Sequence, residues 1–174
     1  NSNDVSVLLN ECASSATPTV TPTAIPPSTI VCPWVPVAEY PIPIFGHAVT
    51  TDGTFVYSIG GWGLNGQVSI VQRYDPVADT WTALADLPVS LAYARAAYAN
   101  VTNKIYVFGG YQECCGYLDS VYIYDVATNT WSSGADMPVV RAFSSVAYYS
   151  GNQKVYVIGG SGLISAQETQ TWEY

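Results

Sequence analysis

The sequence is poor in charged residues, and especially in basic ones. Only 10% of its 174 residues are charged, with five Lys and Arg against thirteen Asp and Glu. Nucleic acid is therefore not an expected partner, because neutralising phosphates requires clusters of basic side chains. No apolar run is long enough to cross a membrane as a helix, so we expect no transmembrane segment.

Residues typical of catalytic and metal sites are also scarce. The single histidine, His47, excludes sites that need several imidazole ligands, and we expect it to be an ordinary hydrogen-bonded strand residue. No nucleophile elbow or phosphate-binding glycine loop occurs. We expect no catalytic residue, no cofactor and no metal.

What the chain does contain is a repeat. The phrase Trp-x-x-x-Ala-acid-x-Pro begins at Trp34, Trp81 and Trp131. Between these phrases, runs of aromatic and β-branched residues close on glycine doublets, namely Gly60-Gly61, Gly109-Gly110 and Gly159-Gly160. The period of about 50 residues, with four short strand-like runs in each unit, predicts blades that bury their faces against their neighbours.

The second unit shows the expected strands most completely. They cover residues 93–99, 104–108 and 120–124, followed by a fourth strand that starts at residue 130. The recurring acids are expected to have structural roles, because Asp75 and Asp125 end third strands. The tryptophans are expected to pack between blades, each with a partner for its indole N–H.

The glycine doublets, the Tyr-Asp pairs and the tryptophans that come after them resemble the kelch motif over residues 33–174. The resemblance implies an all-β protein of four-stranded antiparallel propeller blades, and functions dominated by protein interaction with a minority of enzymes. The arginine often found early in the first kelch strand is matched only by Arg141, where the other units have Ile44 and Leu91. A sugar-active kelch enzyme is the enzymatic alternative, and it predicts a central channel lined by Arg95, Arg141 and an unpaired acid.

The order of the strands predicts an unusual closure. If the strands of a blade are lettered a to d in chain order, the expected strands follow the order d-abcd-abcd-abc. This order runs from a lone fourth strand at Trp34 to a third strand that ends at Tyr174. Three blades do not close a ring, since propellers typically have 4 to 8. Either the sequence is a piece of a longer propeller, or the Trp34 strand of another copy completes the last blade, as a ring or a filament.

Residues 1–32 are expected to form an extended arm outside the blades. Its Thr/Pro tract is typical of extracellular linkers that carry O-linked sugars, with candidate sites at Thr17, Thr19, Thr21 and Thr23. The apolar residues Val5, Val7 and Leu8 are suited to adding a strand to a neighbour, and Trp172 and Tyr174 mark the expected assembly edge.

The cysteines and one sequon fit an oxidising, extracellular setting. Cys12 and Cys32 bracket the tract, and a disulfide between them is the simplest pairing. Three alternatives are then open for the adjacent Cys114 and Cys115: a disulfide with each other, disulfides to the arm, or free thiols. Asn100 begins an Asn-Val-Thr sequon, a candidate glycosylation site. We therefore expect a secreted or cell-surface, non-catalytic module that assembles with its own copies. Two alternatives remain: a fragment of a larger propeller that binds a protein or glycan, and the sugar-active enzyme.

Overall fold

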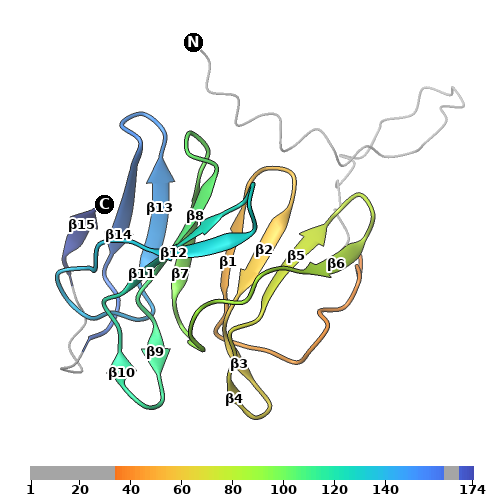
Figure 1. Ribbon diagram of the computed structural model, residues 1–174, viewed down its shortest axis with the longest axis horizontal. Coiled ribbons are helices and arrows are strands. Elements are labelled where there is room, and N and C mark those ends of the chain that lie inside the picture. The colour runs from red at the N-terminus through yellow and green to blue at the C-terminus, as the bar shows by residue number, and fades with distance from the viewer. Residues whose placement is uncertain (1–33, 163–168) are drawn as a thin grey trace, which may run out of the picture. The chain divides into compact units, whose positions relative to one another are not determined.

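The computed structural model describes residues 34–162 and 169–174, and the chain divides into two units, residues 1–37 and 38–174. Every regular element in the described residues is a β-strand, so the predicted all-β class is confirmed (Figure 1). Several predicted sites lie outside the described residues: Cys12, Cys32, Thr17, Thr19, Thr21, Thr23, Val5, Val7 and Leu8.

The first two blades are four-stranded antiparallel sheets, as predicted. The first has the order β1-β2-β5-β6, with β1 (Ala48–Thr51), β2 (Val56–Ile59), β5 (Val71–Asp75) and β6 (Thr80–Ala83). The second has the order β7-β8-β11-β12, with β7 (Arg95–Ala99), β8 (Lys104–Phe108), β11 (Val121–Asp125) and β12 (Thr130–Ser133).

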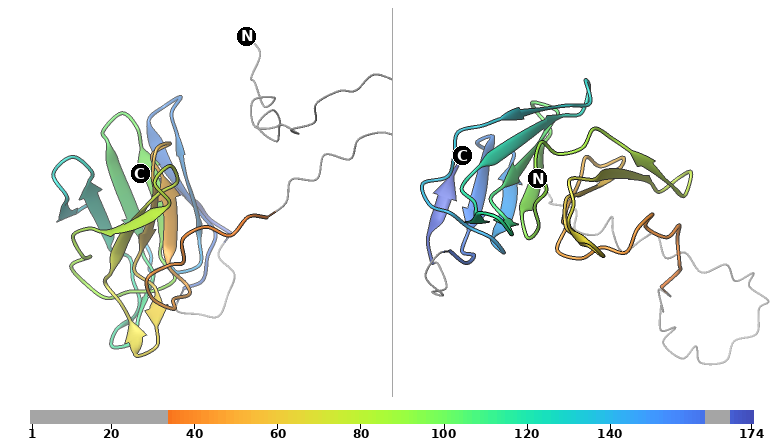
Figure 2. Two further views of the ribbon diagram at one scale, coloured as in Figure 1. Left: turned by 90° about the vertical axis from the view of Figure 1, so that its right-hand side faces the viewer. Right: turned by 60° about the horizontal axis from the view of Figure 1, so that its bottom comes forward.

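The third blade has three strands in the described residues. They are β13 (Ser145–Tyr149), β14 (Lys154–Ile158) and β15 (Thr171–Glu173), in that order. The three sheets lie side by side in chain order, with β7 between β1 and β13 (Figure 1, Figure 2). One apolar core fills the space between the first and second blades and a second core the space between the second and third.

Two short hairpins link the second and third strands of the complete blades, where no strand is expected from the sequence. They are β3 (Trp62–Gly63) with β4 (Gly66–Gln67), and β9 (Tyr111–Gln112) with β10 (Gly116–Tyr117). Both hairpins project from the same end of the blades (Figure 1). Gly66 and Gly116 have φ values of 112° and 82°, which these tight turns require.

The glycine doublets turn the chain sharply out of the second strand of each blade. Gly109 and Gly110 have φ values of 56° and 107°, in a region of backbone angles that residues other than glycine rarely adopt. A Cβ added at Gly110 would lie 2.8 Å from the carbonyl oxygen of Ala92. The doublet therefore serves close packing of the backbone as well as the turn.

Two strand predictions need correction. The strand expected from residue 93 begins at Arg95, because Tyr93 has a φ of 60° and cannot continue an extended strand. Residues 34–40 form no strand, and Trp34 is 102% exposed. The prediction that Trp34 packs between blades is therefore wrong for the single chain.

Candidate functional site

In each complete blade, the fourth strand is tied to the alanine of the preceding tryptophan phrase by a recurring set of hydrogen bonds, which we call a joint. In the first joint, the Trp81 indole donates to the Ala38 carbonyl (3.1 Å) and Asp79 Oδ1 accepts the Ala38 N–H (2.7 Å). In the second, the Trp131 indole donates to the Ala85 carbonyl (2.8 Å). Asn129 Oδ1 accepts the Ala85 N–H (2.8 Å). The second joint connects the first blade to the second, whereas the first joint connects the first blade to the segment that precedes it.

A tyrosine hydroxyl completes the first two joints. Tyr74 donates to Asp79 Oδ1 and Tyr124 donates to Asn129 Oδ1, both at 2.7 Å. The Ala38 N–H, and then the Tyr74 hydroxyl, hold the pKa of the Asp79 carboxyl below its ordinary value. The first joint therefore contains a carboxylate where the second contains an amide.

The third joint is built differently. The Tyr174 hydroxyl itself accepts the Ala135 N–H at 3.1 Å. The Tyr174 ring packs against Phe108 and Tyr106, with centroids 5.5 and 5.6 Å apart. No tryptophan strand comes after β15 in the described residues, so this joint lacks the indole that the other two have.

The outer face of the third blade, which we call the end face, is exposed. It consists of Ala147, Tyr149, Tyr156, Ile158, Thr171 and Glu173, the positions that match the covered face of the second blade. Ile158 is 47% and Tyr149 60% exposed, whereas Phe108, which matches Ile158, is 1% exposed. The polar rim of the end face is already paired, because the Tyr156 hydroxyl donates to Glu173 (3.0 Å) and Lys154 lies 3.5 Å from the same carboxylate.

The residues expected at the assembly edge do not point their side chains outward. Trp172 pairs with Val157, which packs in the core between the second and third blades, and cross-strand partners share a face. Trp172 and Tyr174 therefore face the second blade. The alternation of antiparallel pairs leaves the backbone N–H and C=O of Thr171 and Glu173 directed away from β14, along an open edge.

The inner strands β1, β7 and β13 line an open groove of about 510 Å³. Its walls carry small, β-branched and aromatic side chains, with no charged residue among them: Val49, Thr50, Thr51, Val56, Ala96, Ala97, Tyr98, Val146, Ala147 and Tyr148. Neither Arg95 nor Arg141 is among these walls, so the groove lacks the lining that the sugar-active alternative predicts. This groove offers no pair of acids for glycoside hydrolysis.

Arg141 is instead a fully buried residue that holds the third blade together. Its Nη1 donates to the carbonyls of Gly159 (2.7 Å) and Gln170 (3.3 Å), and its Nη2 donates to Gln170 Oε1 (2.9 Å). Leu91 occupies the matching position of the second blade and is also buried. The guanidinium thus satisfies carbonyls that lie close to the segment entering β15.

His47 is not the satisfied strand residue that we expected. It precedes β1, its ring stacks near Tyr40 (6.0 Å), and its buried Nδ1 has no hydrogen-bond partner. Burial first, and then the nearby charge of Arg95, lower its pKa. Within residues 34–162 and 169–174, no group of three His, Cys, Asp or Glu side chains could hold a metal ion.

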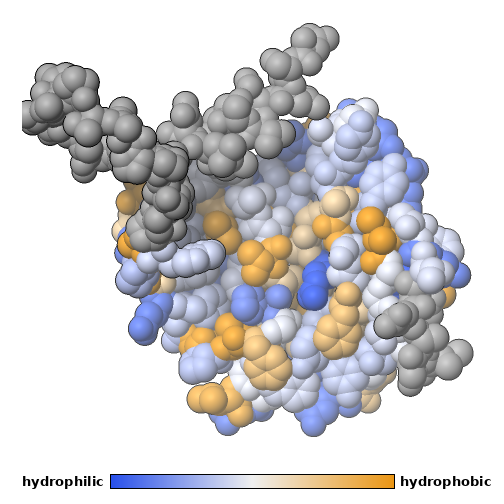
Figure 3. Space-filling model, turned by 180° about the vertical axis from the view of Figure 1, so that it is seen from behind, coloured by the Kyte–Doolittle hydropathy of each residue, from blue (hydrophilic) through white to orange (hydrophobic). Residues whose placement is uncertain are grey.

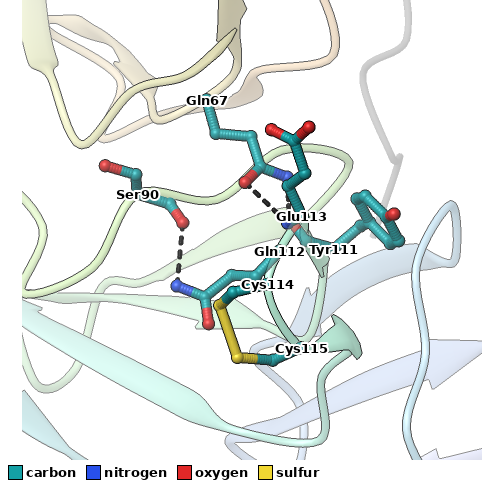
Figure 4. The surroundings of a disulfide bond; sticks show 7 residues. All are labelled: Gln67, Ser90, Tyr111, Gln112, Glu113, Cys114 and Cys115. Carbon is teal, nitrogen blue, oxygen red and sulfur yellow. Dashed lines mark hydrogen bonds between the residues drawn. A yellow bond between two sulfur atoms is a disulfide. The ribbon is translucent and has the colours of Figure 1, made fainter.

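The hairpin end of the blades carries exposed side chains from both short hairpins. Leu64 lies at the tip of β3–β4, and Glu113, Cys114 and Cys115 form the tip of β9–β10, all exposed. Cys114 and Cys115 are joined by a disulfide (Figure 4). Figure 3 shows the molecule from behind relative to Figure 1, and this face mixes apolar and polar side chains without one continuous apolar area. At the opposite end, Asn100 is exposed in the turn between β7 and β8.

The comparisons with known proteins agree with this architecture. The family described as the KLHDC2/KLHL20/DRC7 kelch-repeats domain matches residues 46–174. The chain belongs to the kelch-repeat family. This membership supports a role in protein interaction, as the sequence predicted. Within the described residues, no helix has the length and apolar character needed to cross a membrane.

Individual relatives match over one or two blades. Kelch-like protein 38 of Rattus norvegicus is 35% identical over 68 residues, 38% of this chain and 11% of the relative. Kelch-like protein 35 of Homo sapiens is 31% identical over 80 residues, which are 46% of this chain and 13% of the relative. Alpha-scruin of Limulus polyphemus is 37% identical over 65 residues, which are 37% of this chain and 7% of the relative. The match thus spans about a tenth of each relative's length.

Proposed function

We propose that this chain is a non-catalytic, extracellular kelch module that joins to other copies of itself, head to tail. The acceptor is the open edge of β15 with the end face. The donor is the segment around Trp34 of another copy. The single observation that carries the proposal is the contrast between Phe108 (1% exposed) and Ile158 (47% exposed) at matching positions.

The donor segment matches what the third blade lacks. Residues 34–41 repeat the phrase whose tryptophans form β6 and β12, and Trp34 is fully exposed in the single chain. Seated beside β15, the Trp34 indole would donate to the Ala135 carbonyl, as Trp81 donates to Ala38 and Trp131 to Ala85. Backbone pairing supplies affinity in such strand addition, and side-chain pockets supply specificity.

One difference between the phrases fits the same arrangement. Two residues before their tryptophans, the complete blades have Asp79 and Asn129, which receive the alanine N–H. The corresponding residue before Trp34 is Cys32, which is a weak acceptor. In the third blade the Tyr174 hydroxyl already takes the Ala135 N–H, so a donor without Asp or Asn leaves no group of that joint unpaired.

The extracellular setting rests on composition. The Thr/Pro tract with its flanking Cys12 and Cys32, and an adjacent cysteine pair that forms a disulfide, are typical of proteins in oxidising compartments.

A mixture of two variants tests the head-to-tail junction. Ile158→Lys disables the acceptor face and Trp34→Ala disables the donor. Each variant alone should be monomeric by light scattering, and an equimolar mixture should form a dimer and nothing larger, because only one junction is possible. Val77→Lys, at an exposed position of the first blade, is the matched surface control and should assemble like the unchanged chain. A mixture that stays monomeric would contradict the proposal and assign the end face to a further repeat of the same polypeptide.

A further inference from the structure

The two short hairpins occupy matching places in the first and second blades, yet only β9–β10 contains a disulfide. The turn of β3–β4 consists of Leu64 and Asn65, whereas the longer turn of β9–β10 contains Glu113 and the bridged pair Cys114 and Cys115. The repeat itself does not need sulfur at this place, because the first blade forms its hairpin without it.

Hairpin β9–β10 is clamped to the first blade by the side chain of Gln67. Its Nε2 donates to the Tyr111 carbonyl at 2.8 Å, and its Oε1 accepts the Glu113 N–H at 2.9 Å (Figure 4). Gln112 Nε2 makes a further bond to the Ser90 carbonyl at 2.9 Å. The clamp therefore depends on the backbone geometry of residues 111–113, immediately before the disulfide.

The disulfide restricts that same turn. It closes a small ring that includes the peptide unit between Cys114 and Cys115, so the backbone angles on both sides of this unit cannot vary freely. The Cys115 N–H bonds back to the Gln112 carbonyl at 3.2 Å and closes the turn. Both cysteines are exposed, so a reductant reaches the sulfur atoms without unfolding of the blade.

We propose that Cys114–Cys115 is a redox-modifiable site at which a dithiol reductant releases hairpin β9–β10 from the Gln67 clamp. One thiolate of the reductant attacks a sulfur of the disulfide and forms a mixed disulfide, displacing the other cysteine as a thiolate. The second thiol of the reductant then displaces the remaining cysteine. Two electrons and two protons pass to the protein, giving two cysteine thiols and the oxidised, cyclic disulfide of the reductant.

Opening the ring frees the turn and weakens the Glu113 bond to Gln67. The effect is local, because a disulfide between neighbouring residues closes almost no loop in the unfolded chain and adds little to global stability. It changes the hairpin-end surface by loosening Glu113 and the neighbouring Tyr111–Tyr117 pair, whose rings are 5.6 Å apart. This site is independent of the end face and of the assembly proposed above.

Amide exchange followed by NMR tests the proposal on the folded chain. With dithiothreitol, mass spectrometry should show both thiols of residues 114 and 115 formed, and the Glu113 amide should exchange about tenfold faster. The matching amides of Val68 and Leu118, bonded to Gly61 and Gly110 at 2.9 Å, lie at the hairpin bases and should be unchanged. The melting temperature should move by no more than about 2 °C.

Two variants separate the sulfur from the clamp. The double variant Cys114→Ser with Cys115→Ser should show fast Glu113 exchange without reductant and no response to it. Gln67→Ala should give the same fast exchange while its disulfide stays intact. A pair that resists dithiothreitol in the folded chain, or a Glu113 amide that exchanges equally in both redox states, would overturn the proposal.

Discussion

Phe108 and Ile158 occupy the same position in successive blades, but one is buried and the other is half exposed. The same contrast holds for Ala99, which is buried, and Tyr149, which is 60% exposed. The strands around them have matching registers, so the difference arises from the neighbour of each blade. The second blade is covered by the third, and no described residue covers the third. The face of a kelch blade is therefore buried or exposed according to whether another blade covers it.

The largest expected effect separates these two faces. Phe108→Ala should lower the free energy of unfolding by about 3–5 kcal/mol, because it leaves a cavity in the core between the second and third blades. Ile158→Ala should cost under about 1 kcal/mol in the monomer, since its side chain already meets solvent. Urea unfolding at a concentration where the chain is monomeric measures both. Equal losses would mean that the end face is covered in the single chain.

A smaller effect separates the joints from the unpaired phrase. Trp131→Phe keeps a six-membered aromatic ring but loses the indole N–H that bonds to the Ala85 carbonyl, and it should destabilise the chain by about 1–2 kcal/mol. Trp34→Phe should leave the unfolding of the monomer unchanged, because Trp34 is fully exposed. The same urea experiment compares the two variants. A loss at Trp34 equal to that at Trp131 would show that the first phrase packs against a blade of its own chain.

The smallest effect compares the first two joints in acid. The lowered pKa of Asp79 means that its contribution to stability is complete above its ordinary value of 3.8, and is lost as the pH falls through the lower, folded-state pKa. The second joint has Asn129 at the same place and should not respond. An NMR titration from pH 6 to pH 2 should therefore shift the Ala38 amide, but not the Ala85 amide. Asp79→Asn should abolish the Ala38 response, and a persisting response would contradict this assignment.

The sequence predicted the blades because each signal repeats at the same spacing. The glycine doublets, the Tyr-Asp turns and Trp81 and Trp131 all take the places expected of them, since local backbone requirements decide those positions. Asp75 and Asp125 accept N–H groups of the adjoining turn, as predicted for residues that end third strands.

The features that the sequence could not predict depend on contacts between distant segments. Arg141 resembles a channel residue until its partners Gly159 and Gln170 are known. Tyr93 reads as a strand residue, although its φ of 60° matches that of Gly46 (63°) in the first blade. Gly46 was the signal in the sequence for this break in the strand. A glycine in one repeat marks a position with positive φ, and other residues adopt such a φ only at a cost in conformational energy.

The most direct test of the head-to-tail account is the mass of the unchanged chain in solution, measured by light scattering over a range of concentrations. The account predicts a mass that rises above 18.7 kDa with concentration, and that falls back to one chain in Ile158→Lys. A monodisperse 18.7 kDa particle at every concentration would contradict it.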